Sequence, residues 1–248
     1  MSADVEIKQG KAIVDAAKVF QPQDHIPLKP SLTIVQQAGV QHFVWSSLLN
    51  VTELSGGKLA HVEHFDSKAA IEVYIREIGI PASFFLPGFY MKNLPGGMFR
   101  QLPPNNDWTL GLPIPGTAPV PLLDAAEDTG KFVKGILLHR EKTLGKRIYG
   151  ATDYYTLDQI VAQFKELYPE AGNSAKVVEL PQNVFKGILA QAGQSEEGAT
   201  ELTENMLLMN DFGYYGGADL KESHEVLVDK LTTWKDFMAK SEAFATLK

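Results

Sequence analysis

The sequence contains no cysteine among its 248 residues. This absence excludes a disulfide framework, a thiolate nucleophile and a cysteine-based zinc site, and we predict no metal site. Long hydrophobic runs are also lacking, because no apolar stretch approaches the ~18 residues that a membrane-spanning helix needs. No secretory signal is recognisable either. We therefore expect a soluble cytoplasmic protein with no membrane partner, and the nucleus is the alternative location.

Positive charge is scarce in this chain. Lysine and arginine total 23 against 30 aspartates and glutamates, which gives a formal net charge of −7. Contacts with nucleic-acid phosphates require clustered lysine and arginine, so we expect no direct nucleic-acid binding. Hydrophobic residues make up 44% and charged residues 21%, the usual balance of a folded globular protein.

A glycine-rich phosphate loop is the third absence. A dinucleotide fold needs Gly-x-Gly-x-x-Gly or a close variant directly after a strand, because backbone amides there cradle the pyrophosphate. The glycine pairs Gly56-Gly57, Gly96-Gly97 and Gly216-Gly217 do not follow such a strand. The cradle is therefore not expected in this chain.

Helices and strands are predicted to alternate in the first part of the chain. Amphipathic helices are expected from Asp4 to Lys18 and from His61 to Ile78, and buried strands from Gln41 to Ser46 and from Ala82 to Leu86. This alternation is typical of an α/β fold with a parallel sheet.

The second expected helix can be described in more detail. Val62, Phe65, Ala69 and Val73 form its predicted apolar stripe, and Gly79 is expected to end it.

The second part of the chain has a different character. Residues 87 to 121 are rich in glycine, proline and aromatic residues, as in a pocket-lining region with short strands. Further on, Thr156 and Gln159 have the spacing of a capping box. The other predicted elements are a helix over 125–139, strands over 146–151 and 177–180, a helix opened by Pro181 and one long closing helix over 222–244.

Three segments, in this order, resemble the NmrA-like family, which includes fungal regulators of nitrogen metabolite repression and is related to short-chain dehydrogenases. They are Glu6 to Ala17, His64 to Pro81 and Leu86 to Leu94, and Tyr154 to Val161 fits the same family. The resemblance implies an α/β fold with an incomplete Rossmann-type parallel sheet, whose front strands and glycine-rich loop are missing by N-terminal truncation. Residues 1–88 would form the rear part of this NAD(P)-binding domain. Residues 89–248 would form a smaller α+β C-terminal domain for a substrate or partner, with some segments returning to the sheet.

The resemblance also implies NADP as the cofactor. It places cofactor contacts at Lys8, Lys68, Phe89, Tyr90 and Asn93. A lysine ammonium can bond ribose hydroxyls or face a phosphate, and the loop with the two aromatic residues follows the carboxyl end of a predicted strand. Each residue also has a structural interpretation, as a helix-surface lysine or a core aromatic. Because the phosphate cradle is missing, we expect impaired NADP binding.

Catalytic relatives use a Tyr-x-x-x-Lys pair, in which the lysine lowers the pKa of the tyrosine. Here the tyrosine position holds His64, so that His64 and Lys68 are only weak catalytic candidates. Two potential cations one helical turn apart do not form an activated pair, and a helix-surface histidine is the favoured interpretation. Ser46 and Ser47 follow a strand where such enzymes often hold a serine, but without the tyrosine this signal is weak. We expect no catalytic residues.

The segment from Val19 to Gln37 departs from the family pattern as an insertion. Every valine codon begins with GT and a glutamine codon can be CAG, the usual boundaries of an intron. We favour a translated intron, and a genuine proline-rich surface loop is the alternative. Transcript sequencing distinguishes the two. With the front strands missing, the strand from Gln41 to Ser46 should also have an open edge.

Three functions remain open. The first is a non-catalytic NADP-responsive redox sensor that acts through a protein partner, such as a transcription regulator in nitrogen-metabolite control. The second is an NADPH-dependent reductase of a quinone or small aromatic substrate, for which the aromatic and proline-rich segment from Phe84 to Trp108 would supply a pocket. The third is a truncated fragment with impaired cofactor binding.

Overall fold

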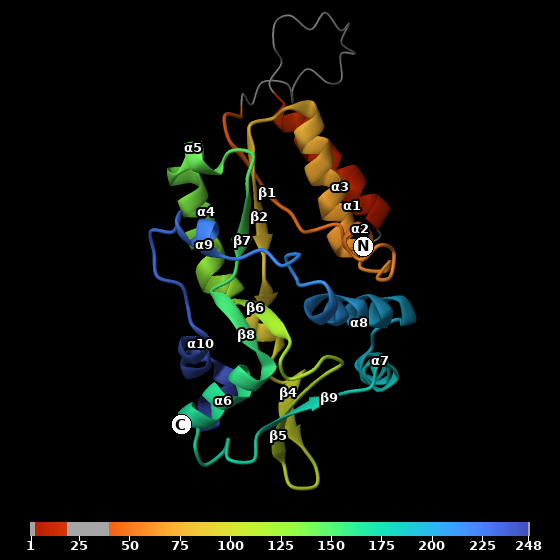
Figure 1. Ribbon diagram of the computed structural model, residues 1–248, viewed down its shortest axis with the longest axis vertical. Helices are drawn as coiled ribbons and strands as arrows, with labels where there is room; N and C mark the ends of the chain where they lie inside the picture. The colour runs from red at the N-terminus through yellow and green to blue at the C-terminus, as the bar shows by residue number, and fades with distance from the viewer. Residues whose placement is uncertain (1–2, 19–39, 248) are drawn as a thin grey trace, which may run out of the picture.

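A computed structural model describes residues 3–18 and 40–247 (Figure 1). Its centre is a parallel three-stranded sheet in the order β1-β2-β7, formed by Phe43–Ser46, Ala82–Pro87 and Arg147–Gly150. Phe43 lies opposite Ala82 and Phe84 opposite Arg147. The predicted parallel pairing of the first two strands is confirmed, and β7 joins them from much later in the chain. The division into domains at residue 88 stays a prediction.

Helices cover both faces of this sheet (Figure 1). On one face, α3 (Glu63–Ile78) packs against β2, and α1 (Ala3–Ala17) packs against α3. On the other face, α4 (Ala125–Leu138) packs against β2 and β7. The N-cap of α4 is Asp124, whose side chain accepts the backbone N–H of Glu127. These helices bury the apolar side chains of the strands, as a sheet of this class requires.

The predicted apolar stripe of α3 was wrong at one position. Val73 is 53% exposed, whereas its neighbour Glu72 is 1% exposed. The buried face instead continues from Phe65 through Ala69 to Ile75. A charged residue occupies this inward position because Arg76 of the same helix, Arg147 of β7 and the hydroxyl of Ser47 bind its carboxylate. The C-terminus is as predicted, since Gly79 caps the helix in the left-handed conformation, with φ 73°.

Two further three-stranded sheets complete the fold. One has the order β3-β6-β8 and the other β4-β5-β9. Their strands are Phe89–Tyr90, Pro119–Leu123 and Asp153–Thr156 in the first, and Phe99–Leu102, Asp107–Leu112 and Lys176–Glu179 in the second. The remaining elements are α2 (Val51–Leu54), η2 (Met91–Asn93), α5 (Arg140–Thr143), α6 (Leu157–Leu167), α7 (Gln182–Gln191), α8 (Glu196–Asp211), α9 (Lys221–His224), α10 (Trp234–Lys240) and η3 (Glu242–Leu247).

One face of the β4-β5-β9 sheet joins a buried aromatic cluster. Phe99 and Trp108 pack on Phe164 of α6 with ring centroids 4.7 and 5.1 Å away, and Phe244 of η3 closes the cluster. The predicted capping box at the start of α6 is confirmed, because Thr156 and Gln159 exchange hydrogen bonds.

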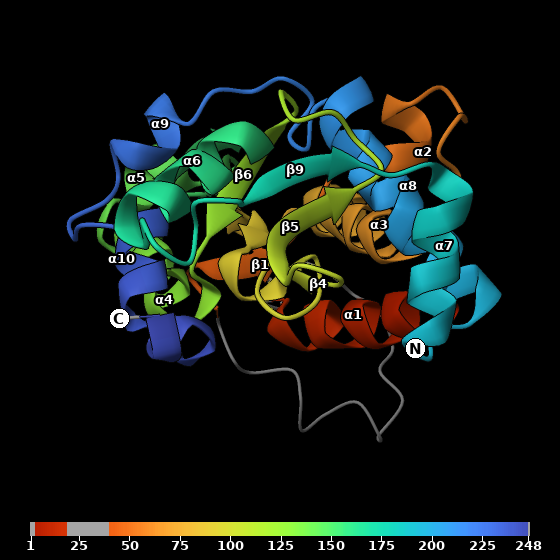
Figure 2. The ribbon, with the colours of Figure 1, turned by 90° about the horizontal axis from the view of Figure 1, so that it is seen from below.

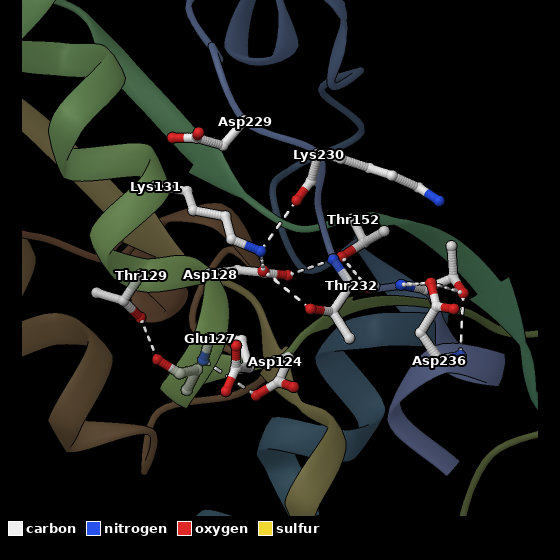
Figure 3. A network of polar contacts seen from close by, with 12 residues as sticks. Asp124, Glu127, Asp128, Thr129, Lys131, Thr152, Asp229, Lys230, Thr232 and Asp236 are labelled. Atoms are coloured by element: carbon white, nitrogen blue, oxygen red, sulfur yellow. Dashed lines mark hydrogen bonds and ion pairs between the residues drawn. The ribbon is translucent and has the colours of Figure 1, made fainter. Parts of the chain in front are cut away.

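The prediction of a single helix over residues 222–244 was wrong. The structure has α9, an irregular segment over 225–233, α10 and η3 there. Figure 3 shows why the middle is not helical, because buried Asp128 of α4 accepts the backbone N–H and the hydroxyl of Thr232. A new helix then begins at Thr233, which forms a capping box with Asp236. The spacing of apolar residues predicted one helix because it carries no information about these interruptions.

The segment from Val19 to Gln37, interpreted above as a translated intron or a surface loop, lies outside the described residues. Within the described part of the chain, no helix has the length and apolar character needed to cross a membrane. The same residues contain no group of three or more side chains that could ligate a metal ion.

Candidate functional site

The carboxyl ends of β1, β2 and β7 meet at one edge of the central sheet, where open α/β sheets bind ligands. A hollow of about 240 Å³ lies there between the sheet and α4. Ser46 lines it at the end of β1, Pro87 at the end of β2 and Tyr90 in the short strand β3. The other lining residues are Val44, Phe85, Thr129 and Val133. The hollow is mainly apolar, and two hydroxyls and a phenol are its polar side-chain groups.

β1 is an edge strand within the described part of the chain. The backbone N–H groups of Phe43 and Ser47 donate to Pro81 and Phe85 across the β1–β2 ladder. Since alternate residues of a parallel strand point their backbone groups to opposite sides, those of Val44 and Ser46 face the open edge. The predicted open edge is thus present among the described residues.

The structure separates the predicted cofactor-contacting residues. Tyr90 lies in the hollow and is 37% exposed, whereas Phe89 is 6% exposed and belongs to the hydrophobic core. Lys8 is exposed on α1. Asn93, in η2, lies at a different depression, beside the β4–β5 hairpin. Lys68 does not line the hollow that Tyr90 lines. The cofactor roles of all five residues stay predictions.

Lys68 is held in an ion pair on the α1 side of α3. Its Nζ donates to Oε1 of Glu6 at 2.6 Å, and Ser67 donates to the other carboxylate oxygen at 2.7 Å. Partial burial raises the pKa of Glu6, but the bonds from Lys68 and Ser67 outweigh it, so that the pKa is below its ordinary value. Trp45 of β1 donates its indole N–H to the Lys68 carbonyl at 3.3 Å.

His64 is bound to an element that the sequence did not predict. Its Nδ1 lies 2.5 Å from Oε1 of Glu201 in α8, and its backbone N–H donates to the same oxygen at 2.9 Å. His61 repeats the arrangement with Glu204, at 2.6 Å for Nδ1 and 2.8 Å for the backbone. The two histidines therefore fasten the start of α3 to α8. A signal for α8 exists in the sequence, since Ser195 precedes two glutamates and caps the helix.

The carboxylate of Glu72 connects α3 to β7 and to the end of β1. It accepts the hydroxyl of Ser47, just after β1, at 2.5 Å. It also accepts Nε of Arg147, in β7, at 2.8 Å and Nε of Arg76 at 3.0 Å. Ser47 is fully buried, so it is a support for the sheet edge, whereas its neighbour Ser46 is exposed at the hollow.

The described residues do not fit a whole dinucleotide. The backbone N–H groups of Val51 and Thr52, at the start of the helix that follows β1, already bind the carboxylate of Asp66 at 2.6 and 3.3 Å. A phosphate could reach these amides only by displacing that carboxylate. The hollow is also smaller than the ~300–1,000 Å³ of usual ligand pockets. The hollow by itself is therefore too small for a whole dinucleotide.

Comparison with known proteins gives a consistent pattern. The model of the NmrA-like family matches residues 32–238. The NmrA-like family domain-containing oxidoreductase lnaB of Aspergillus flavus is 31% identical over 183 residues, covering 69% of this chain and 48% of that protein. The nitrogen metabolite repression protein nmr of Neurospora crassa is 32% identical over 157 residues, covering 61% of this chain and 28% of that protein. The chain spans about half the length, or less, of the curated relatives it matches.

Solved structures show the same fold. NmrA, a negative transcriptional regulator crystallised with NADP, superimposes with a TM-score of 0.71 at 20% identity, covering 96% of this chain and 70% of that one. The NADPH-dependent quinone oxidoreductase QOR2 of Escherichia coli has a TM-score of 0.60 at 19% identity, covering 80% and 65%. At these identities the likeness concerns the Rossmann-type α/β fold alone, and it confirms the predicted fold class.

Proposed function

Because the chain belongs to the NmrA-like family, we propose that it is a non-catalytic, redox-sensing regulator that acts through a protein partner in transcriptional control of nitrogen metabolism. Relatives include both nitrogen metabolite repression proteins and proteins named as oxidoreductases. Such a role places it in the cytoplasm or the nucleus. Its net charge of −7 favours a protein partner over direct nucleic-acid contact.

One observation carries the non-catalytic part of the proposal. The two side chains at the Tyr-x-x-x-Lys positions are His64 and Lys68, and each is bound to a different carboxylate on a different element. A general acid must reach the atom that it protonates, and its pKa must suit that transfer. His64 is turned to Glu201 and Lys68 to Glu6, and neither lines the hollow by Tyr90, so neither meets the requirement of reach there.

NADP would be the sensed molecule, held weakly by this chain. The carboxylate of Asp66 on the α2 amides and the small volume of the hollow both support weak binding. Ser46 and Tyr90 are the polar groups that could contact one end of the cofactor.

A reductase is the second candidate function, and it is favoured by the names of several relatives. Five of them are called NmrA-like family domain-containing oxidoreductases, at 28–31% identity. In that case a substrate hydroxyl, water or Tyr90 would have to replace the missing tyrosine as the proton source.

Two measurements separate the candidates. Purified full chain is titrated with NADP and NADPH in a calorimeter, and NADPH oxidation is followed at 340 nm across a panel of quinones. We expect no micromolar binding and no turnover above the protein-free rate. Turnover that Lys68→Ala abolishes and the matched surface variant Lys165→Ala retains would establish the reductase. A micromolar dissociation constant for NADP would contradict the proposal that this chain holds the cofactor weakly.

The regulatory role needs a test of its own. The chain is expressed in a Neurospora crassa strain that lacks its nitrogen metabolite repression protein. We expect repression to be at least partly restored, and to the same extent by Lys68→Ala, because the proposed role requires no catalysis. Failure of the well-folded chain to restore any repression would count against the regulator.

A further inference from the structure

A second and larger depression shares no lining residue with the hollow at the sheet edge. It has a volume of about 720 Å³ and lies between the β4-β5-β9 sheet and α7, a region that Figure 2 shows from below. We call it the hairpin groove. Its volume is within the ~300–1,000 Å³ of pockets that bind small molecules. One face of the sheet is filled by the aromatic cluster around Phe99, and the groove occupies the opposite face.

The floor of the groove follows from the alternation of side chains along the strands. Phe99 and Leu110 point to the core, so Arg100 and Thr109 point to the groove. In the sheet register, Arg100 lies opposite Thr109 and Thr109 lies opposite Lys176. A guanidinium, a hydroxyl and an ammonium thus come from one row across three strands. Thr109 is 4% exposed, and its bond to the Asp107 carbonyl is long, at 3.3 Å.

The walls of the groove are apolar. Phe185 of α7 is almost completely buried and belongs to the hydrophobic core. The apolar residues that line the groove include Met98, Val178, Leu180, Phe185, Ile188 and Leu189. A molecule held between them would exchange water for hydrocarbon contact along its length, the main source of affinity in such pockets.

The charge of the groove is opposite to that of the protein. Its charged lining residues are Arg100, Lys176 and Asp107, so two cations face one anion. Lys176 is 3.6 Å from the Asp107 carboxylate, and Arg100 forms no ion pair or hydrogen bond among the described residues. A positive pocket in a chain of net charge −7 favours an anionic ligand, for which a guanidinium provides paired donors.

We propose that the hairpin groove binds a small organic acid, with its carboxylate at Arg100 and Lys176 and its apolar body along α7. The site is separate from the hollow that Tyr90 lines, and binding requires neither NADP nor a protein partner. Binding of an organic acid in the hairpin groove can therefore be tested independently of the proposed regulatory role.

The experiment compares two probes of equal chain length, octanoate and 1-octanol, by calorimetric titration of the full chain. Octanoate should bind saturably at one site and more tightly than octanol. Arg100→Gln should weaken octanoate about tenfold, the loss of one hydrogen bond to a charged group, and leave octanol unchanged. Lys176→Gln should act in the same direction. The matched control is Lys92→Gln, an exposed residue that does not line the groove and should have no effect.

Amide chemical shifts of the unsubstituted protein provide a second measurement that does not depend on how the variants fold. Octanoate should shift the amides of Thr109, Gly111 and Val178, and leave those of Ser46 and Tyr90 in place. Absence of saturable octanoate binding overturns the proposal. Equal affinity for octanoate in the Arg100→Gln and unsubstituted proteins, or shifts confined to other regions, would also overturn it.

Discussion

Replacing Glu72 by alanine should destabilise the protein more than any other single charge removal on α3. The side chain is 1% exposed, and its carboxylate binds Ser47 of the sheet edge together with Arg76 and Arg147. Without it, the buried Ser47 hydroxyl loses a charged acceptor, at a cost of about 1–3 kcal/mol. A fully buried ion pair would lose about 3–5 kcal/mol.

The loss expected for Glu72→Ala is smaller than that of a fully buried ion pair, because the two arginines are partly exposed. Their side chains are 42% and 38% exposed, so water can replace the carboxylate, and each contributes only about 0–1 kcal/mol. We therefore expect the free energy of unfolding to fall by about 2–4 kcal/mol for Glu72→Ala. Glu72→Gln keeps an acceptor but loses the charge, and should cost about 1–2 kcal/mol.

Urea denaturation followed by tryptophan fluorescence measures both changes, and an unchanged slope with urea concentration shows that only stability has altered. The control is Glu77→Ala, an exposed carboxylate on the same helix, for which we expect a change within about 0.5 kcal/mol. The reasoning is refuted if Glu72→Ala is no more destabilising than Glu77→Ala. A larger effect for Gln than for Ala would refute the assignment of the cost to the lost acceptor.

Three further predictions concern packing, polar networks and titration. Gly150→Ala should lower the free energy of unfolding by about 1–3 kcal/mol, because its new Cβ would lie 2.3 Å from the Phe85 ring. The control is Gly130→Ala on α4, whose Cβ meets nothing within 4 Å, and we expect it to be neutral or stabilising in the same thermal or urea unfolding assay. Asp128→Ala should cost about 3–5 kcal/mol in the same assay, because it leaves buried donors unpaired (Figure 3), and a loss below about 1 kcal/mol would contradict this. Burial raises the pKa of Tyr154 to about 12, so the neutral phenol is favoured in the folded state, and stability should fall as pH rises from about 10 to 12. Denaturation curves across that range should show a shallower fall for Tyr154→Phe, and an unchanged fall would exclude this residue as a cause.

The elements that sequence reasoning located are those with local signals. Gly79 ends α3, and the Thr156–Gln159 capping box begins α6, as predicted. Each signal lies within four residues of the element it defines, so it is present before the chain folds. The failure at residues 222–244 has the opposite origin. There the local spacing favoured one helix, but Asp128, 104 residues away from Thr232, binds the segment in a non-helical conformation.

The candidate site was predictable only in part. The parallel strands predict a functional edge at their carboxyl ends, and the hollow with Ser46 and Tyr90 lies there. Spacing alone placed His64 and Lys68 together on one helix, but it gave no information about their partners. The sequence predicted that residues 87 to 121 line a pocket, but it did not predict the floor of the hairpin groove, because β9 joins the β4–β5 hairpin there from much later in the chain.

The sequence by itself determined the α/β class, the family, most helix and strand positions, and the absence of a tyrosine at position 64, because these depend on residue identity and on spacing within a few residues. Only the tertiary structure decided what the charged side chains do. Lys68 meets Glu6 across 62 residues, and His64 meets Glu201 across 137. The partner of a charge depends on which elements pack together, and packing is a property of the whole chain.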